Sequence, residues 1–170
     1  MCIHILVTND DGVQAPGLLA LVQEMRRIGR VSVLAPDRNW SASGHVKTME
    51  RPLRVKEARL ADGSTALASD GAPSDCVALG LMGLITEKVD LVVSGINPNA
   101  NLGHDVTYSG TVTAAMEAAI WGLPGLAVSL DSPRNHLTEV DSQPAARVAA
   151  QVALKVIAEG LPKGVLRNIN

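Results

Sequence analysis

Two adjacent carboxylates, Asp10 and Asp11, end a short apolar run near the start of the chain. Residues 3–8 have the length and β-branched character of a buried strand, and the Asn-Asp-Asp-Gly sequence that follows is a stop signal. Ligands of open α/β sheets bind at such strand ends. Neighbouring carboxylates repel unless a cation or water screens them. We therefore predict a divalent metal site here, with a turn and helix cap as the alternative.

Two further loops that follow predicted strands carry oxygen ligands. One holds Ser41 and Ser43, and the other holds Asn97. Carboxylate, hydroxyl and amide oxygens together suit a hard cation such as Mg²⁺ or Mn²⁺. Because parallel strands end at the same sheet edge, we expect one of the two serines and Asn97 to lie near the acid pair.

A third group, Ser109-Gly110-Thr111, begins an alanine-rich stretch with helical spacing. The free N–H groups of a helix start bind anions, and Gly110 leaves room for a close approach. The alternative is an ordinary Ser/Thr N-cap. If the anion interpretation holds, a phosphate would lie beside the predicted metal.

The elements that must position these residues alternate along the chain. Residues 51–65, with Asp62-Gly63 at a turn, predict an antiparallel excursion. The alternation predicts one α/β domain over residues 1–170, with a mostly parallel sheet covered by helices on both faces. Apolar spacing and breakers predict helices at 16–28, 73–83, 111–121 and 144–158, and strands at 3–8, 31–35, 66–68, 89–93, 126–130 and 165–169.

Composition excludes several classes of protein. Apolar residues make up 46% of the 170 residues, which excludes a disordered chain. A net charge of −2 and 2% aromatic residues argue against a nucleic-acid polymer as partner. The N-terminus lacks a basic leader and no apolar run could span a membrane, so we expect a cytoplasmic protein without a membrane partner. The fingerprints of P-loop, dinucleotide-binding and α/β-hydrolase enzymes are also absent.

With these stretches in view, the sequence resembles the SurE family of survival-protein nucleotidases. The resemblance covers nearly the whole chain and rests on motifs in one fixed order: residues 5–12 with 15–17, 35–39 with Ser41, 71–77, and 93–117. It implies the three-layer, Rossmann-like SurE fold. It also implies a divalent-metal-dependent nucleoside monophosphate phosphatase, a 5′/3′-nucleotidase that also acts on short polyphosphate.

The resemblance assigns the metal site residue by residue. It implies one divalent ion per subunit, held by Asp10, Asp11, Ser41 and Asn97, and so selects Ser41 over Ser43. Mg²⁺ or Mn²⁺ is the expected ion, with Ca²⁺ as a substitute in crystals. Asp10 and Asp11 are the expected catalytic residues, which anchor the ion and orient the attacking water.

The substrate's phosphate is expected to contact a second set of residues. Ser109, Gly110 and Thr111 would donate hydrogen bonds to its charged oxygens. Asn9 and Asn97 complete the predicted substrate-binding residues.

Two departures from the family pattern stand out. Asn99 occupies a position where the family usually has glycine, and asparagine tolerates the same left-handed backbone. Family members also run further, with a C-terminal part used in assembly that this chain is expected to lack. The homodimer or homotetramer is therefore an expectation for the full-length family form.

Three rival interpretations remain open at this point. A haloacid-dehalogenase-like phosphatase needs a second aspartate two residues after its nucleophile, and Gly12 stands there after Asp10. A response-regulator receiver also pairs acids near its first strand. The third rival is a non-catalytic module that binds metal or nucleotide without hydrolysing it.

Overall fold

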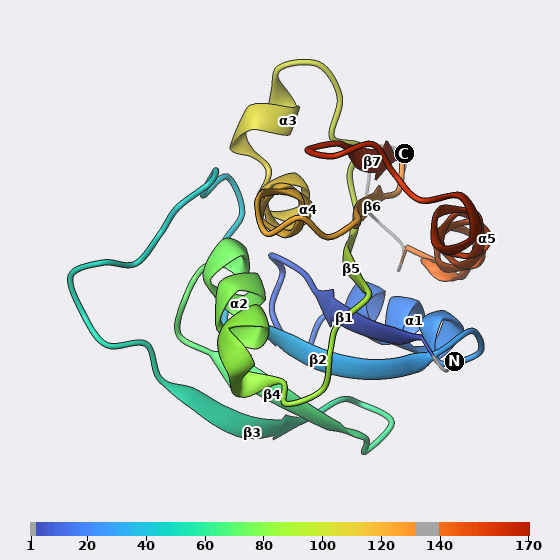
Figure 1. The fold of residues 1–170 in the computed structure, drawn as a ribbon. Coiled ribbons are helices and arrows are strands. Elements are labelled where there is room, and N and C mark those ends of the chain that lie inside the picture. The colour runs from blue at the N-terminus through green and yellow to red at the C-terminus, as the bar shows by residue number, and fades with distance from the viewer. Residues whose placement is uncertain (1–2, 132–139) are drawn as a thin grey trace.

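The computed structural model describes residues 3–131 and 140–170, and a single mixed sheet organises them (Figure 1). The strand order is β3-β4-β2-β1-β5-β6-β7, and only β3, at one edge, runs antiparallel to its neighbour among the pairings of these residues. The strands are β1 (His4–Thr8), β2 (Arg30–Pro36), β3 (Val55–Arg59), β4 (Thr65–Ser69), β5 (Leu91–Asn97), β6 (Gly125–Ser129) and β7 (Leu166–Ile169). The helices are α1 (Pro16–Met25), α2 (Pro73–Leu79), η1 (Gly80–Leu84), α3 (Asp105–Tyr108), α4 (Gly110–Ile120) and α5 (Gln143–Glu159).

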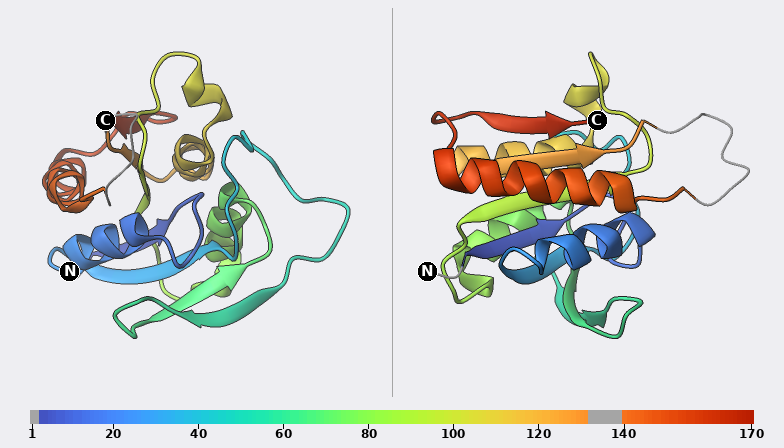
Figure 2. Two further views of the ribbon diagram at one scale, coloured as in Figure 1. Left: turned by 180° about the vertical axis from the view of Figure 1, so that it is seen from behind. Right: turned by 90° about the vertical axis from the view of Figure 1, so that its right-hand side faces the viewer.

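Helices cover both faces of this sheet, which confirms the predicted α/β fold. Helices α1 and α5 pack together on one face, and α2 and α4 on the other (Figures 1 and 2). Alternation along β1 explains the two layers, because Ile5 and Val7 join the core under α1 and α5 while Leu6 joins the core under α2 and α4. Both cores are built from aliphatic side chains, as the aromatic-poor composition requires.

Several elements differ from the sequence prediction, most of them by one or two residues at their ends. Helix α1 ends at Met25, and β5 continues through Ser-Gly-Ile to Asn97. The predicted helix 73–83 is divided at Gly80, where the shorter η1 begins. Helix α3 lies inside the stretch predicted as loop.

The topology places the switch point of the sheet at the neighbouring strands β1 and β5. On one side of β1 lie β2, β4 and β3, and on the other side lie β5, β6 and β7. The order therefore reverses beside β1, and the carboxyl ends of β1 and β5 flank the switch point where such sheets bind ligands. Asp10 and Asp11 follow β1, and Asn97 ends β5. Within residues 3–131 and 140–170, no helix is long and apolar enough to cross a membrane.

Candidate functional site

The turn that carries the acid pair is closed by Asn9. The Asn9 side-chain amide donates to the carbonyl oxygen of Gly12 at 2.9 Å, and its Oδ1 accepts the Gly12 N–H at 3.2 Å. Gly12 has φ +102°, a conformation that glycine adopts without strain. Asn9 is fully buried. We infer that it shapes the turn, and the phosphate contact predicted for it stays a prediction.

Asp10 is turned away from solvent toward the start of α4. Its side chain is 4% exposed, and the Thr111 hydroxyl donates to its Oδ1 at 2.6 Å. Gly110 permits this approach, because a Cβ at that position would lie 2.7 Å from Asp10 Cβ. The acid pair and the predicted phosphate-binding helix start, separated by about a hundred residues, therefore form one site.

Asp11 is only partly buried and connects to the loop after β2. The Asn39 side-chain amide donates to Asp11 Oδ1 at 3.2 Å, while Asn39 Oδ1 accepts the Ser41 N–H at 2.7 Å. The Trp40 N–H donates to the main-chain oxygen of Asp10 at 2.7 Å. These bonds bring the Ser41 loop to the acid pair, and they identify Asn39 as a positioning residue that the sequence analysis did not select.

Asn97 reaches the same edge from β5. Its side-chain nitrogen donates to the carbonyl oxygen of Asn99 at 2.5 Å, so the side-chain oxygen is the atom suited to a cation. The preceding residue, Ile96, lies so close to Gly17 of α1 that a Cβ there would meet its carbonyl oxygen at 2.4 Å. Glycine at position 17 thus lets α1 pack directly against the end of β5.

The surroundings of Asp10 and Asp11 favour protonation of these carboxylates or the binding of a cation. Burial raises the pKa of Asp10 above its ordinary value of 3.8, although the hydrogen bonds from Thr111 oppose it. Burial, and then the charge of Asp10, raise the pKa of Asp11 from 3.8 to about 6, although the Asn39 hydrogen bond lowers it. Across residues 3–131 and 140–170, neither carboxylate forms an ion pair with Lys, Arg or His.

The donor set fits a hard divalent cation. No cluster of three or more His, Cys, Asp and Glu side chains that could hold a metal occurs in the described part of the chain. The predicted ligands instead combine two carboxylates with the side-chain oxygens of Ser41 and Asn97. Such all-oxygen sets suit Mg²⁺ or Mn²⁺ rather than Zn²⁺. A cation would also stabilise the charged form of two carboxylates whose pKa values are raised, chiefly by burial.

Replacing Asp11 with asparagine should stabilise the metal-free protein at neutral pH. The native pKa of Asp11, about 6, lies above its ordinary 3.8, so between these values the native state binds more protons than the unfolded state. The free energy of unfolding then falls as pH rises through this window and stays low above it. With allowance for solvent screening, Asp11→Asn should gain about 1 kcal/mol at pH 7.5 and almost nothing at pH 4. Denaturant titrations with a chelator measure this difference, and equal gains at both pH values would contradict it.

The Thr111 hydroxyl should hold the Asp10 carboxylate in position. Thr111 is fully buried, so Thr111→Val keeps its shape and removes only the hydrogen bond. We expect the affinity for Mn²⁺ to fall about 10- to 100-fold, as for other outer-shell partners of metal ligands. Thr111→Ser, which keeps the hydroxyl, should restore most of the affinity. Equal affinity of the valine and serine variants would contradict this role.

The three predicted phosphate-binding residues at the start of α4 differ in the contacts that they make in the structure. Ser109 caps α4, because its hydroxyl oxygen accepts the Val112 N–H at 3.2 Å, so the N-cap interpretation is correct at this residue. Thr111 directs its hydroxyl at Asp10, not outward. Gly110 is buried against Asp10. The predicted contacts of these residues with a phosphate stay predictions.

Two buried acids hold the far end of the Ser41 loop, and no local sequence pattern indicates this role for either. Glu117 of α4 accepts hydrogen bonds from Lys47 at 2.5 Å, His45 at 2.8 Å and Trp121 at 2.9 Å. Burial alone raises the pKa of Glu117, but these bonds outweigh it and hold the pKa below its ordinary 4.5.

Asp75, at the start of α2, is the second of these acids. It accepts the Thr48 N–H at 3.1 Å and the Thr48 hydroxyl at 2.7 Å, while also accepting the Ala72 N–H at 3.0 Å. The segment after the predicted metal ligand Ser41 is therefore fastened to both helices of one layer.

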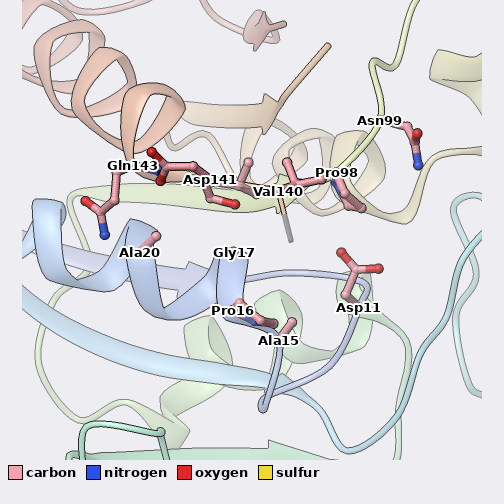
Figure 3. Close-up of a pocket in the computed structure, with 12 residues that line it drawn as sticks. Asp11, Ala15, Pro16, Gly17, Ala20, Pro98, Asn99, Val140, Asp141 and Gln143 are labelled. Atoms are coloured by element: carbon pink, nitrogen blue, oxygen red, sulfur yellow. Dashed lines mark hydrogen bonds between the residues drawn. The ribbon is translucent and has the colours of Figure 1, made fainter. Parts of the chain in front are cut away.

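A cavity of about 810 Å³ opens beside Asp11 (Figure 3). Its walls come from the start of α1, from the end of β5 with the residues after it, and from the start of α5. Figure 3 shows Asp11 at one end and Gln143 at the other, with Gly17 and Val140 between them. Nothing in the local pattern of residues 140–143 indicates that they line the same cavity as Asp11.

Comparisons with known proteins agree with the resemblance. Residues 5–170 match the family model described as survival protein SurE. The chain is 54% identical over 168 residues to a 5′-nucleotidase SurE from Chloroflexus aggregans and 52% identical over 167 residues to one from Herpetosiphon aurantiacus. Each alignment covers 98% of this chain and 65% of the relative, so the chain spans slightly less than two thirds of their length.

A solved structure agrees as well. The crystal structure of the SurE protein from Aquifex aeolicus superposes with a TM-score of 0.82 at 41% sequence identity. The superposition covers 94% of this chain and 62% of that one. The fold predicted from the sequence is therefore confirmed.

Proposed function

Since the chain belongs to the SurE family, we propose that it is a divalent-metal-dependent phosphatase that hydrolyses nucleoside monophosphates. The observation that carries this proposal is the acid pair at the switch point, with Asp10 buried against the start of α4 and Asp11 partly buried at the cavity. Relatives named 5′-nucleotidase supply the reaction class, which we extend to this chain.

The residues have separate tasks in the proposed reaction. A bound divalent cation would polarise a phosphoryl oxygen and favour deprotonation of a water molecule. Asp10, Asp11, Ser41 and Asn97 would hold that cation. Thr111 and Asn39 orient the two carboxylates through the hydrogen bonds described above. Positioning and charge stabilisation of this kind supply most of the catalysis in phosphoryl transfer.

The position of Asp10 against the start of α4 supports the predicted phosphate contacts. Asp10 already accepts hydrogen bonds from the main chain and the hydroxyl of Thr111. A phosphate at this helix start would therefore lie beside Asp10, and a cation between them would offset their repulsion. The proposed phosphate residues remain Ser109, Gly110, Thr111, Asn9 and Asn97.

Finer assignments are part of the same proposal. We propose one Mg²⁺ or Mn²⁺ per chain, activity on short polyphosphate in addition to nucleotides, and a cytoplasmic location. A homodimer or homotetramer is proposed for the longer family form. The haloacid-dehalogenase-like alternative is disfavoured by Gly12, whose φ of +102° serves the turn where that mechanism needs an acid.

Phosphate release from a panel of nucleoside monophosphates tests the proposed function. We expect release with Mn²⁺ or Mg²⁺, none after a chelator, and recovery when the ion is added back. Absence of release under every condition, together with normal metal and nucleotide binding, would instead establish the non-catalytic module.

A further inference from the structure

The geometry points to Glu117 of α4 as a positioning residue for the proposed metal ligand Ser41, an inference that rests on the proposed function. Glu117 is only 2% exposed. A buried carboxylate is costly unless it is paired and hydrogen-bonded, so its partners indicate its role. Two of those partners, His45 and Lys47, belong to residues 43–48, which follow Ser41 and which we call the strap.

The strap bonds to both helices of one layer. The Gly44 N–H donates to the carbonyl oxygen of Tyr108, before α4, at 2.9 Å. The Gly44 carbonyl oxygen accepts the Thr113 hydroxyl of α4 at 3.1 Å. On the side of α2, the Ser74 hydroxyl donates to the carbonyl oxygen of Val46. The strap is therefore an extended segment whose successive residues are held from two sides.

Polar bonds, rather than apolar packing, hold the strap in place. None of residues 41–49 belongs to a hydrophobic core formed by the described residues. The one apolar side chain of the strap, Val46, is 37% exposed. Glu117 accepts His45 on one carboxylate oxygen at 2.8 Å and Lys47 on the other at 2.5 Å. Loss of this carboxylate would therefore release the middle of the strap.

A tight turn transmits the position of the strap to Ser41. The Ser43 N–H donates to the carbonyl oxygen of Trp40 at 3.2 Å, which closes a turn around Ser41 and Ala42. Ala42 has φ +57°, a left-handed conformation that is unfavourable for a residue with a Cβ and persists where its surroundings impose it. The turn is held on one side by the Trp40 bond to Asp10 and on the other by the strap.

Helix α4 thereby fixes two of the proposed ligands relative to each other. Thr111, near its start, bonds directly to Asp10. Glu117, further along the same helix, holds the strap that follows Ser41. Because a metal ion requires its ligands at defined distances, a loosened strap should weaken binding although every ligand is still present.

The variant Glu117→Gln tests this role, since it keeps the shape of the side chain and removes its charge. We expect the affinity for Mn²⁺, measured by electron paramagnetic resonance titration, to fall about 3- to 10-fold, less than for a direct partner of a ligand. The Mn²⁺ concentration that gives half the maximal rate should rise by the same factor, and the maximal rate should change less. Glu24→Gln, the same change at a buried acid of α1 that pairs with Arg27, is the matched control.

A second pair of variants guards against misfolding, because Lys47 is exposed. Lys47→Met removes the ion pair and should weaken Mn²⁺ binding about as much as Glu117→Gln. Lys47→Arg keeps a charged donor and should restore most of the affinity. Amide hydrogen exchange of the strap without metal should accelerate at least about tenfold in Glu117→Gln and Lys47→Met, and stay unchanged in Glu24→Gln.

A double-mutant cycle connects the effect to Ser41. In a Ser41→Ala background, Glu117→Gln should change the Mn²⁺ affinity by less than about twofold. The same loss in both backgrounds, or wild-type affinity and exchange in Glu117→Gln and Lys47→Met, would overturn the positioning role while the phosphatase function stands. If the wild type released no phosphate from any substrate, the proposed function would fail, and the expected differences in Mn²⁺ affinity and exchange would still support the positioning role.

Discussion

Replacing Asp10 with asparagine is expected to reduce metal-dependent phosphate release by at least about 10³-fold, because losing a direct ligand should exceed the 10- to 100-fold cost of losing an outer-shell partner. Asparagine has the shape of aspartate and its Oδ1 can still accept the Thr111 hydroxyl. The fold should therefore persist, and removal of a buried charge should not lower stability. Initial rates with Mn²⁺, alongside thermal unfolding, measure both effects.

The matched control for Asp10→Asn is Asp62→Asn, the same chemical change on the exposed β3–β4 turn. It should leave the rate within about twofold, because surface substitutions away from the site have little effect. Asp11→Asn should resemble Asp10→Asn in activity while differing from the control. Normal turnover by both site variants would refute the assignment of the acid pair as metal ligands.

Gly110→Ala should damage the site although alanine is the better helix former. At an ordinary helix position the change would stabilise by about 0.5–1 kcal/mol. Here the added Cβ would lie 2.7 Å from Asp10 Cβ and 3.0 Å from Asp10 Oδ2, so α4 or the acid pair must shift. We expect stability to fall by about 1–3 kcal/mol and activity by about 10²-fold, as for other small displacements of catalytic groups.

A double-mutant cycle tests the stated cause of the Gly110→Ala effect. In an Asp10→Gly background both contacting Asp10 atoms are gone, and the nearest remaining contact is Pro73 Cγ at 3.2 Å. The stability cost of Gly110→Ala should then shrink by about 1 kcal/mol or more. The same cost in both backgrounds would show that the close contact with Asp10 is not its source.

The local sequence pattern was sufficient to predict the strand that precedes the acid pair. The apolar run, the polar stop and the position before a helical stretch predicted β1, the turn and α1 with only small errors at the ends. The extension of β5 to Asn97 was not predicted, because Ser-Gly-Ile-Asn has the composition of a loop. Its backbone remains extended because it pairs with β6, with a register shift between Ser94 and Asn97.

The side-chain arrangement of the site depends on contacts that no local pattern contains. Thr111 and Asp10 are 101 residues apart, and Asn39 and Asp11 are 28 apart. Sheet topology predicts that their loops share an edge, but which side chains bond is decided by packing between layers. The place of Gln143 in the cavity beside Asp11 could not be predicted for the same reason. It depends on how α5 packs against α1 and β5, which no local pattern contains.

Direct counting of bound Mn²⁺ tests most directly the claim that the acid pair holds a catalytic cation. The electron paramagnetic resonance signal of free Mn²⁺ decreases as the ion binds, so a titration gives the number of ions per chain. We expect one tight site per chain in the wild type, retained by Asp62→Asn and lost in the Asp10→Asn/Asp11→Asn double variant. A wild type that binds no Mn²⁺, or a double variant that binds it as tightly as the wild type, would show that the acid pair does not hold a cation.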